Sequence, residues 1–170
     1  MRKGIVILAG LAILGLANYS IYSRERLLTE GSLVLLQLAP VDPRSLMQGD
    51  YIALRMQVAN DLRSRVAKEA LRDGHVVLAL DEQRVGTFAR VDSGTPLAAN
   101  EARMRYRVRN DQIKFATNAF FFQEGDANLY AKARYGEFRV GGDGESILTG
   151  LRDEQLSILG PAARKTKEQR

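Results

Sequence analysis

The chain has no cysteine, and this absence excludes disulfide bonds, thiolate catalysis and cysteine-ligated metal sites. It has a single histidine, His75, so a metal centre built on two histidines cannot form within one chain. Tryptophan is absent, and aromatic residues make up only 7% of the 170 residues. The glycine-rich segment around Asp143 lacks the spaced oxygen ligands of a calcium loop. The sequence therefore predicts no metal and no cofactor.

What remains is an ordinary globular composition, with 45% hydrophobic and 26% charged residues, in a length that suits one domain. The net charge of +5 comes from the two ends of the chain: Arg2 and Lys3 at the start and a basic tail, residues 161–170, at the end. A nucleic-acid-binding protein gathers its basic residues on one folded face. We therefore expect no nucleic-acid partner.

One long run near the N-terminus, residues 4–22, carries no charge. As a helix it would measure roughly 28 Å, close to the hydrocarbon thickness of a bilayer. Tyr19 and Tyr22 lie near its end, where membrane proteins place interfacial aromatic residues. The sequence therefore predicts an N-terminal transmembrane helix over residues 4–22.

The flanks of this run give its orientation. A short basic N-terminus before a first hydrophobic segment usually stays in the cytoplasm, so residues 1–3 are predicted to be cytoplasmic. A cleaved signal peptide, with residues 15–17 as its cleavage site, is the alternative. Both interpretations export the rest of the chain. Residues 23–31 form a short predicted linker, so the domain should lie close to the bilayer.

The predicted domain, residues 32–160, has short strand-like segments separated by tight turns. Strict alternation places Ala102, Met104 and Tyr106 on one face of a strand. One helix is predicted from Asn60 or Asp61, as its cap, to about residue 71. These patterns favour a mainly β fold: an antiparallel sheet or small barrel with one or two short helices. The predicted strands are residues 32–38, 51–58, 75–80, 86–91, 102–109, 112–116, 135–140 and 146–151.

Two stretches carry a family resemblance. Residues 49–54 (GDYIAL) resemble the signature of the GDYXXLXY family, an uncharacterised group of bacterial membrane-anchored proteins, although Met56 replaces its final aromatic residue. Residues 120–122 and 133–140 are similar to the C-terminal segment of that family. The resemblance implies a domain on the periplasmic side of the bacterial inner membrane. It also implies, as partner, a multi-pass membrane protein encoded nearby.

The loop before the signature is the candidate binding site. Arg44 offers a planar guanidinium for a carboxylate or phosphate, and Asp42 and Asp50 offer carboxylates. The same residue types also suit a rigid turn, in which Asp42 caps backbone amides and Gly49 permits a positive φ. Both interpretations stay open, and the candidate binding residues are Asp42, Arg44, Gly49, Asp50 and Tyr51.

A catalytic role would need a nucleophile with a positioned base. Ser45 and Met47 partly match the Ser-x-Met-x-Pro pattern of signal peptidases, but Gly49 stands where the proline should be. No lysine can be nominated as the base from its position. We therefore expect a non-enzymatic domain that binds a membrane protein or an envelope component, with an envelope serine hydrolase using Ser45 as the alternative. The aromatic run, residues 120–122, is predicted to be a buried strand with one ring outward, with contact to lipid or a partner as the alternative.

Overall fold

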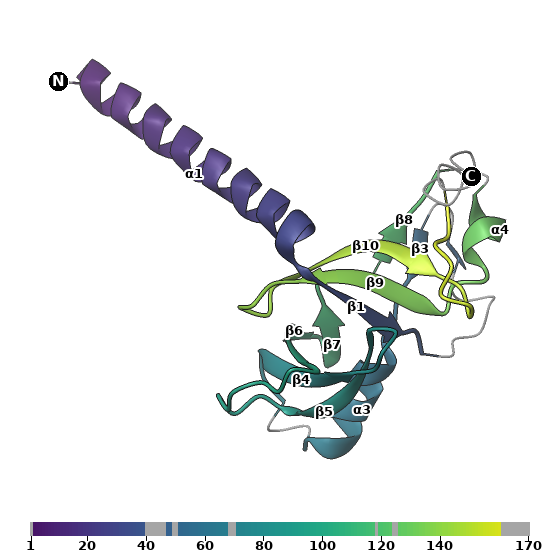
Figure 1. Cartoon of the computed structure of the whole chain (residues 1–170). Coiled ribbons are helices and arrows are strands. Elements are labelled where there is room, and N and C mark those ends of the chain that lie inside the picture. The colour runs from purple at the N-terminus through teal and green to yellow at the C-terminus, as the bar shows by residue number, and fades with distance from the viewer. Residues whose placement is uncertain are drawn as a thin grey trace.

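The computed structural model describes residues 2–39, 47–48, 51–67, 71–117, 119–123 and 126–160. A long N-terminal helix, α1 (Arg2–Glu30), extends away from a β domain that contains all the strands (Figure 1). Most of α1 touches nothing else, so its large apolar side chains are exposed. In the part of the chain that is described, no helix reaches the combination of length and apolar character needed to cross a bilayer.

The predicted linker, residues 23–31, is not a separate connection, because α1 continues through it to Glu30. Only Gly31 lies between α1 and the first strand. A side chain at Gly31 would place its Cβ 2.3 Å from the carbonyl oxygen of Leu27, which accepts the Gly31 N–H at 3.0 Å. The Arg139 guanidinium donates to the carbonyl oxygen of Gly31 at 3.1 Å. The helix is therefore attached directly to the sheet.

A seven-stranded sheet in the order β10-β9-β1-β5-β4-β6-β7 makes up most of the domain. All neighbours pair antiparallel except β1 and β5, which pair parallel. The sheet curls into a nearly closed barrel, and the Arg105 N–H donates to the carbonyl oxygen of Gly144, in the β9–β10 turn, at 2.8 Å. Its strands are β1 (Ser32–Gln37), β4 (Gly74–Leu80), β5 (Val85–Val91), β6 (Glu101–Arg109), β7 (Gln112–Phe115), β9 (Tyr135–Val140) and β10 (Ser146–Arg152).

The core lies on the inner face of this curled sheet. Alternate residues of β6 and β9 point into it, as the period of a strand requires. The largest fully buried side chains are Phe115, Phe138, Leu35, Leu36, Leu62, Leu78, Met104 and Leu151. Burial of these apolar groups is the main force that holds the domain together.

A small three-stranded sheet and two short helices complete the domain. Its strands are β2 (Met47–Gln48), β3 (Tyr51–Ala53) and β8 (Ala119–Phe121), in the order β2-β3-β8. The helices are α3 (Gln57–Arg65) and α4 (Ala127–Tyr130).

The mainly β prediction is confirmed, and most predicted strands agree with the structure to within about a residue. Two local predictions were wrong. The strand predicted over residues 51–58 ends at Ala53. The helix α3 begins at Gln57, several residues before the predicted cap, and ends at Arg65, several residues before the predicted end at about residue 71. Asp61 lies inside this helix and accepts a hydrogen bond from Gln57 at 3.1 Å, so it caps nothing.

Candidate functional site

The predicted binding loop is described only at its end. Of its five candidate residues, Tyr51 is described, whereas Asp42, Arg44, Gly49 and Asp50 lie outside the described residues. The proposed nucleophile Ser45 also lies outside them. The site therefore has to be built from the second half of the signature and from the surfaces around it.

The second half of the signature alternates between two environments. Ile52, Leu54 and Met56 are buried in the core, and Tyr51 is half-buried on the other side of the chain. Met56, which stands where the signature has an aromatic residue, is buried beside Gly136, and its Cε would lie 3.4 Å from a Cβ at that position.

Tyr51 faces an aromatic residue of the neighbouring strand. It is the cross-strand partner of Phe121, and their ring centroids are 5.7 Å apart. Phe121 is 74% exposed, whereas Phe120 and Phe122 pack their rings against Tyr130 at 5.1 and 5.3 Å. The buried-strand prediction for residues 120–122 therefore holds only in part: Phe120 and Phe122 are partly buried against the core, and Phe122 lies after the end of β8. The ring of Phe121 points outward and forms an exposed aromatic surface beside half-buried Tyr51.

A second surface lies on the outward face of β6 and β7, and we name it the cationic groove. It is a depression of about 280 Å³ that a residue of α1 also lines. Five of its lining residues are basic and one is acidic: Arg24, Arg105, Arg107, Arg109, Lys114 and Glu145.

Three of the arginines on the outward face of β6 are neutralised. Arg103 Nε lies 2.6 Å from Asp92 Oδ2, Arg105 pairs with Glu145, and Arg109 Nη1 lies 2.9 Å from Asp73 Oδ1. The hydrogen bond from Arg109 and the Val108 N–H lower the pKa of Asp73. Arg107 differs, because its cross-strand partner is Lys114 and no described carboxylate pairs with either.

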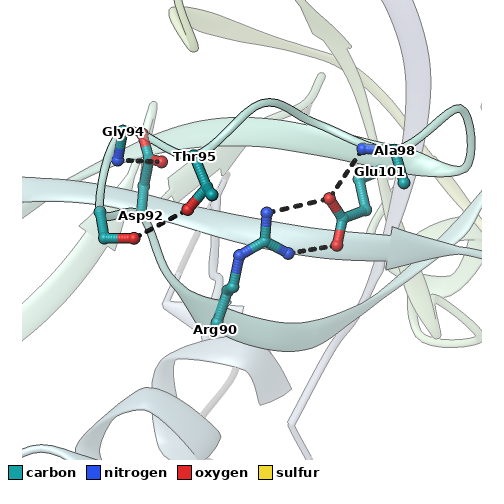
Figure 2. Close-up of polar contacts among 7 residues, drawn as sticks. Arg90, Asp92, Gly94, Thr95, Ala98 and Glu101 are labelled. Atoms are coloured by element: carbon teal, nitrogen blue, oxygen red, sulfur yellow. Dashed lines mark hydrogen bonds and ion pairs between the residues drawn. The ribbon is translucent and has the colours of Figure 1, made fainter.

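The opposite end of β6 holds a compact polar network (Figure 2). The guanidinium of Arg90 donates to both carboxylate oxygens of Glu101, and the Ala98 N–H donates to Glu101 Oε2 at 3.0 Å. Arg90 first and Ala98 second lower the pKa of Glu101. Asp92 accepts the Gly94 N–H at 3.0 Å, and this bond, followed by Arg103, lowers the pKa of Asp92. The network fastens the loop between β5 and β6.

Sequence reasoning missed the cationic groove, although part of its signal was present. Asn110 and Asp111 form the turn of a two-residue hairpin, with φ of 52° and 59°. Such a turn fixes the register, which places Arg107 opposite Lys114. The strict alternation of β6 identified the core residues, but no role was assigned to the arginines between them.

The chemistry available to these surfaces is that of binding. Within the described ranges, no group of three or more His, Asp or Glu side chains could hold a metal ion. The exposed aromatic surface suits apolar or stacking contacts, and the cationic groove suits anions.

One family comparison and two searches bear on these surfaces. A protein-family model described as GDYXXLXY protein matches residues 13–151. No curated protein matches the chain, and no solved structure matches it.

Proposed function

The chain belongs to the GDYXXLXY family, and from this premise we propose that it is a non-enzymatic domain tethered to the periplasmic side of the bacterial inner membrane, where it binds a membrane-protein partner. One observation carries the proposal: the uncharged run of α1, residues 4–22, exposes large apolar side chains, and the helix continues directly into the sheet.

Large apolar side chains on several sides of α1 have no protein to pack against. Leu8 and Leu16 are 70% and 71% exposed, and Ile13 is 68% exposed. A helix that is apolar all round is normally buried in a protein core or in a membrane. The uncharged run, residues 4–22, has the length of a hydrocarbon core, so a bilayer supplies the missing cover.

The tether is tested by fractionation of bacteria that express the full chain. We expect the protein to stay in the membrane after an alkaline carbonate wash, with the β domain open to protease added to the periplasmic side. Charging the helix with Leu11→Arg and Ile13→Arg should release it. Wild-type protein in the soluble fraction would contradict the tether.

The exposed aromatic surface of Tyr51 and Phe121 supports the proposed binding of a membrane-protein partner. Aromatic residues are enriched among those that dominate binding energy at protein interfaces. Phe121 is on the edge strand β8 of the small sheet and is 74% exposed, so its replacement should leave the fold intact.

Partner binding is tested by a photo-crosslinking amino acid at position 121, with exposed position 83, in the β4–β5 turn, as the matched control. We expect position 121 alone to yield a crosslink to a multi-pass membrane protein, and Phe121→Ser to reduce its recovery several-fold. Equal crosslinks from both positions would mean that this surface binds nothing specific.

The non-enzymatic part of the proposal has its own test. We expect a fluorophosphonate probe to leave the wild-type protein unlabelled, because a serine nucleophile requires a positioned base. Labelling that disappears in Ser45→Ala would instead establish an envelope serine hydrolase.

A further inference from the structure

The pairing of Arg107 with Lys114 is unfavourable as it stands. They are direct cross-strand partners on β6 and β7, and directly opposed like charges destabilise a sheet. Their neighbours Tyr106 and Phe115 are buried, which places Arg107 and Lys114 together on the outward face. An anion bound between them would remove this repulsion.

The surroundings add further positive charge. Arg24, from α1, lines the same groove, and no described carboxylate pairs with it. The acidic residue of the groove, Glu145, already pairs with Arg105. Among the described residues, three cations of the groove, Arg24, Arg107 and Lys114, therefore have no carboxylate partner within ion-pair distance and can meet an external anion.

The shape of the groove limits the size of the ligand. Its volume of about 280 Å³ lies just below the usual range of pockets that enclose whole small molecules, so it suits a headgroup. Guanidinium groups bind phosphate through two parallel hydrogen bonds, and a lysine contributes a point charge. Phosphate is thus the chemical group that the lining recognises.

A second cavity joins the groove to the apolar helix. It has a volume of about 680 Å³, lies between α1 and the β9–β10 turn, and shares Arg24, Arg107 and Glu145 with the groove. Glu30 and Asp143 also line it. Leu16 and Tyr19 line it further toward the N-terminus. The two spaces together offer an apolar end and a cationic end, which is the arrangement of a phospholipid.

We propose that the cationic groove binds the phosphate of an anionic phospholipid headgroup, with the acyl chains lying along α1 beside Leu16 and Tyr19. This inference rests on the proposed tether, because Arg24 comes two residues after Tyr22, where the uncharged run ends at the headgroup layer. Anionic lipid would then fix how the β domain stands on the bilayer.

The test uses the full chain in non-ionic detergent and a fluorescent short-chain phosphatidylglycerol as the probe. The double variant Arg107→Gln/Lys114→Gln should weaken binding at least tenfold. The matched control Arg55→Gln/Arg72→Gln removes the same charge from exposed positions outside the groove and should leave binding unchanged. Equal weakening by both would reduce the effect to net charge and overturn the site.

Two further measurements keep the result clear. Arg24→Gln alters α1 and leaves the β domain unchanged, so its expected threefold or greater weakening does not depend on the stability of the sheet. Inorganic phosphate should displace the probe only at millimolar concentration. Displacement at the same concentration as lipid would identify free phosphate as the ligand and overturn the lipid assignment.

The inference and the tether fail in different ways. A chain that leaves the membrane on fractionation, yet binds the lipid probe through Arg107 and Lys114, would lose the tether and keep the groove. A chain that stays in the membrane but whose wild type does not bind the probe would lose the groove alone.

Discussion

The outward face of β6 changes character along its length. At its start, Glu101 pairs with Arg90, and Arg103 pairs with Asp92, so each charge has an opposite neighbour. Nearer its end, Arg107 stands opposite Lys114, between Arg105 and Arg109, which each pair with a carboxylate. The ion pairs of the first half stabilise the fold. In the second half, Arg107 and its partner Lys114 on β7 stay unneutralised, which lowers the stability of the fold, and such a loss of stability is common at binding surfaces. One strand thus carries a structural half and a candidate binding half.

The inward face of β6 should show the largest effect, because both halves depend on it. Met104 is fully buried, and Met104→Ala should lower the free energy of unfolding by about 2–5 kcal/mol through lost contacts and a cavity. Urea denaturation of the variant measures this loss. A loss below about 1 kcal/mol would mean that the core does not close over this strand.

The structural half should respond next, and in a pH-dependent way. Arg90 and the Ala98 N–H lower the pKa of Glu101 in the folded chain. The stability that they contribute is complete above the unfolded pKa of about 4.3 and is lost as pH falls toward the folded pKa. Glu101→Gln should therefore lower the melting temperature at pH 7 and flatten its fall below about pH 5.

Thermal melts from pH 7 to pH 3 measure this slope. Glu82→Gln is the matched control, since Glu82 is exposed in the β4–β5 turn. If the melting temperature of Glu101→Gln falls with pH as steeply as that of the control, the network in Figure 2 does not stabilise the loop.

The binding half should respond with the opposite sign. Lys114→Glu places a carboxylate opposite Arg107 and should raise the free energy of unfolding by about 0.2–1 kcal/mol. Urea denaturation at low salt measures the gain, and high salt should reduce it. A loss of stability would contradict the repulsion between the two cations.

The smallest effect is expected from removing one cation without adding an anion. Arg107→Gln should raise the free energy of unfolding by no more than about 0.5 kcal/mol, because it relieves the repulsion and forms no new pair. Arg72→Gln, at an exposed position, is the control and should change nothing. A marked loss of stability in Arg107→Gln, with none in Arg72→Gln, would show that Arg107 stabilises the fold, as the charged residues in the first half of β6 do.

The parts of the fold that depend on local pattern were predictable. The limits of β9 were predicted to the residue, and the apolar face of β6 followed from the alternation of Ala102, Met104 and Tyr106. The turn at Asn110 was likewise evident, since asparagine and aspartate tolerate positive φ. These features follow from short-range geometry that a single sequence expresses.

Features that depend on distant contacts were not predictable. The parallel pairing joins Leu35 of β1 to Val85 of β5, and the sequence of neither strand indicates that it pairs with the other. The start of α3 follows Met56, which makes no side-chain cap, so no cap residue marked it. In the site, the opposition of Arg107 and Lys114 could be deduced from the hairpin, but the approach of Arg24 depends on where α1 meets the sheet.

The direct attachment of α1 to β1 through Gly31 makes rotation of the helix a rotation of the whole barrel. An α-helix turns by about 100° per residue, so the direction in which the barrel faces around the helix axis depends on the number of residues in the helix. One alanine inserted before Gly31 would turn the cationic groove about 100° around the helix axis, and four together would bring it back to within about 40° of its original direction. The number of residues in α1 thus sets the direction in which the barrel faces around the helix axis.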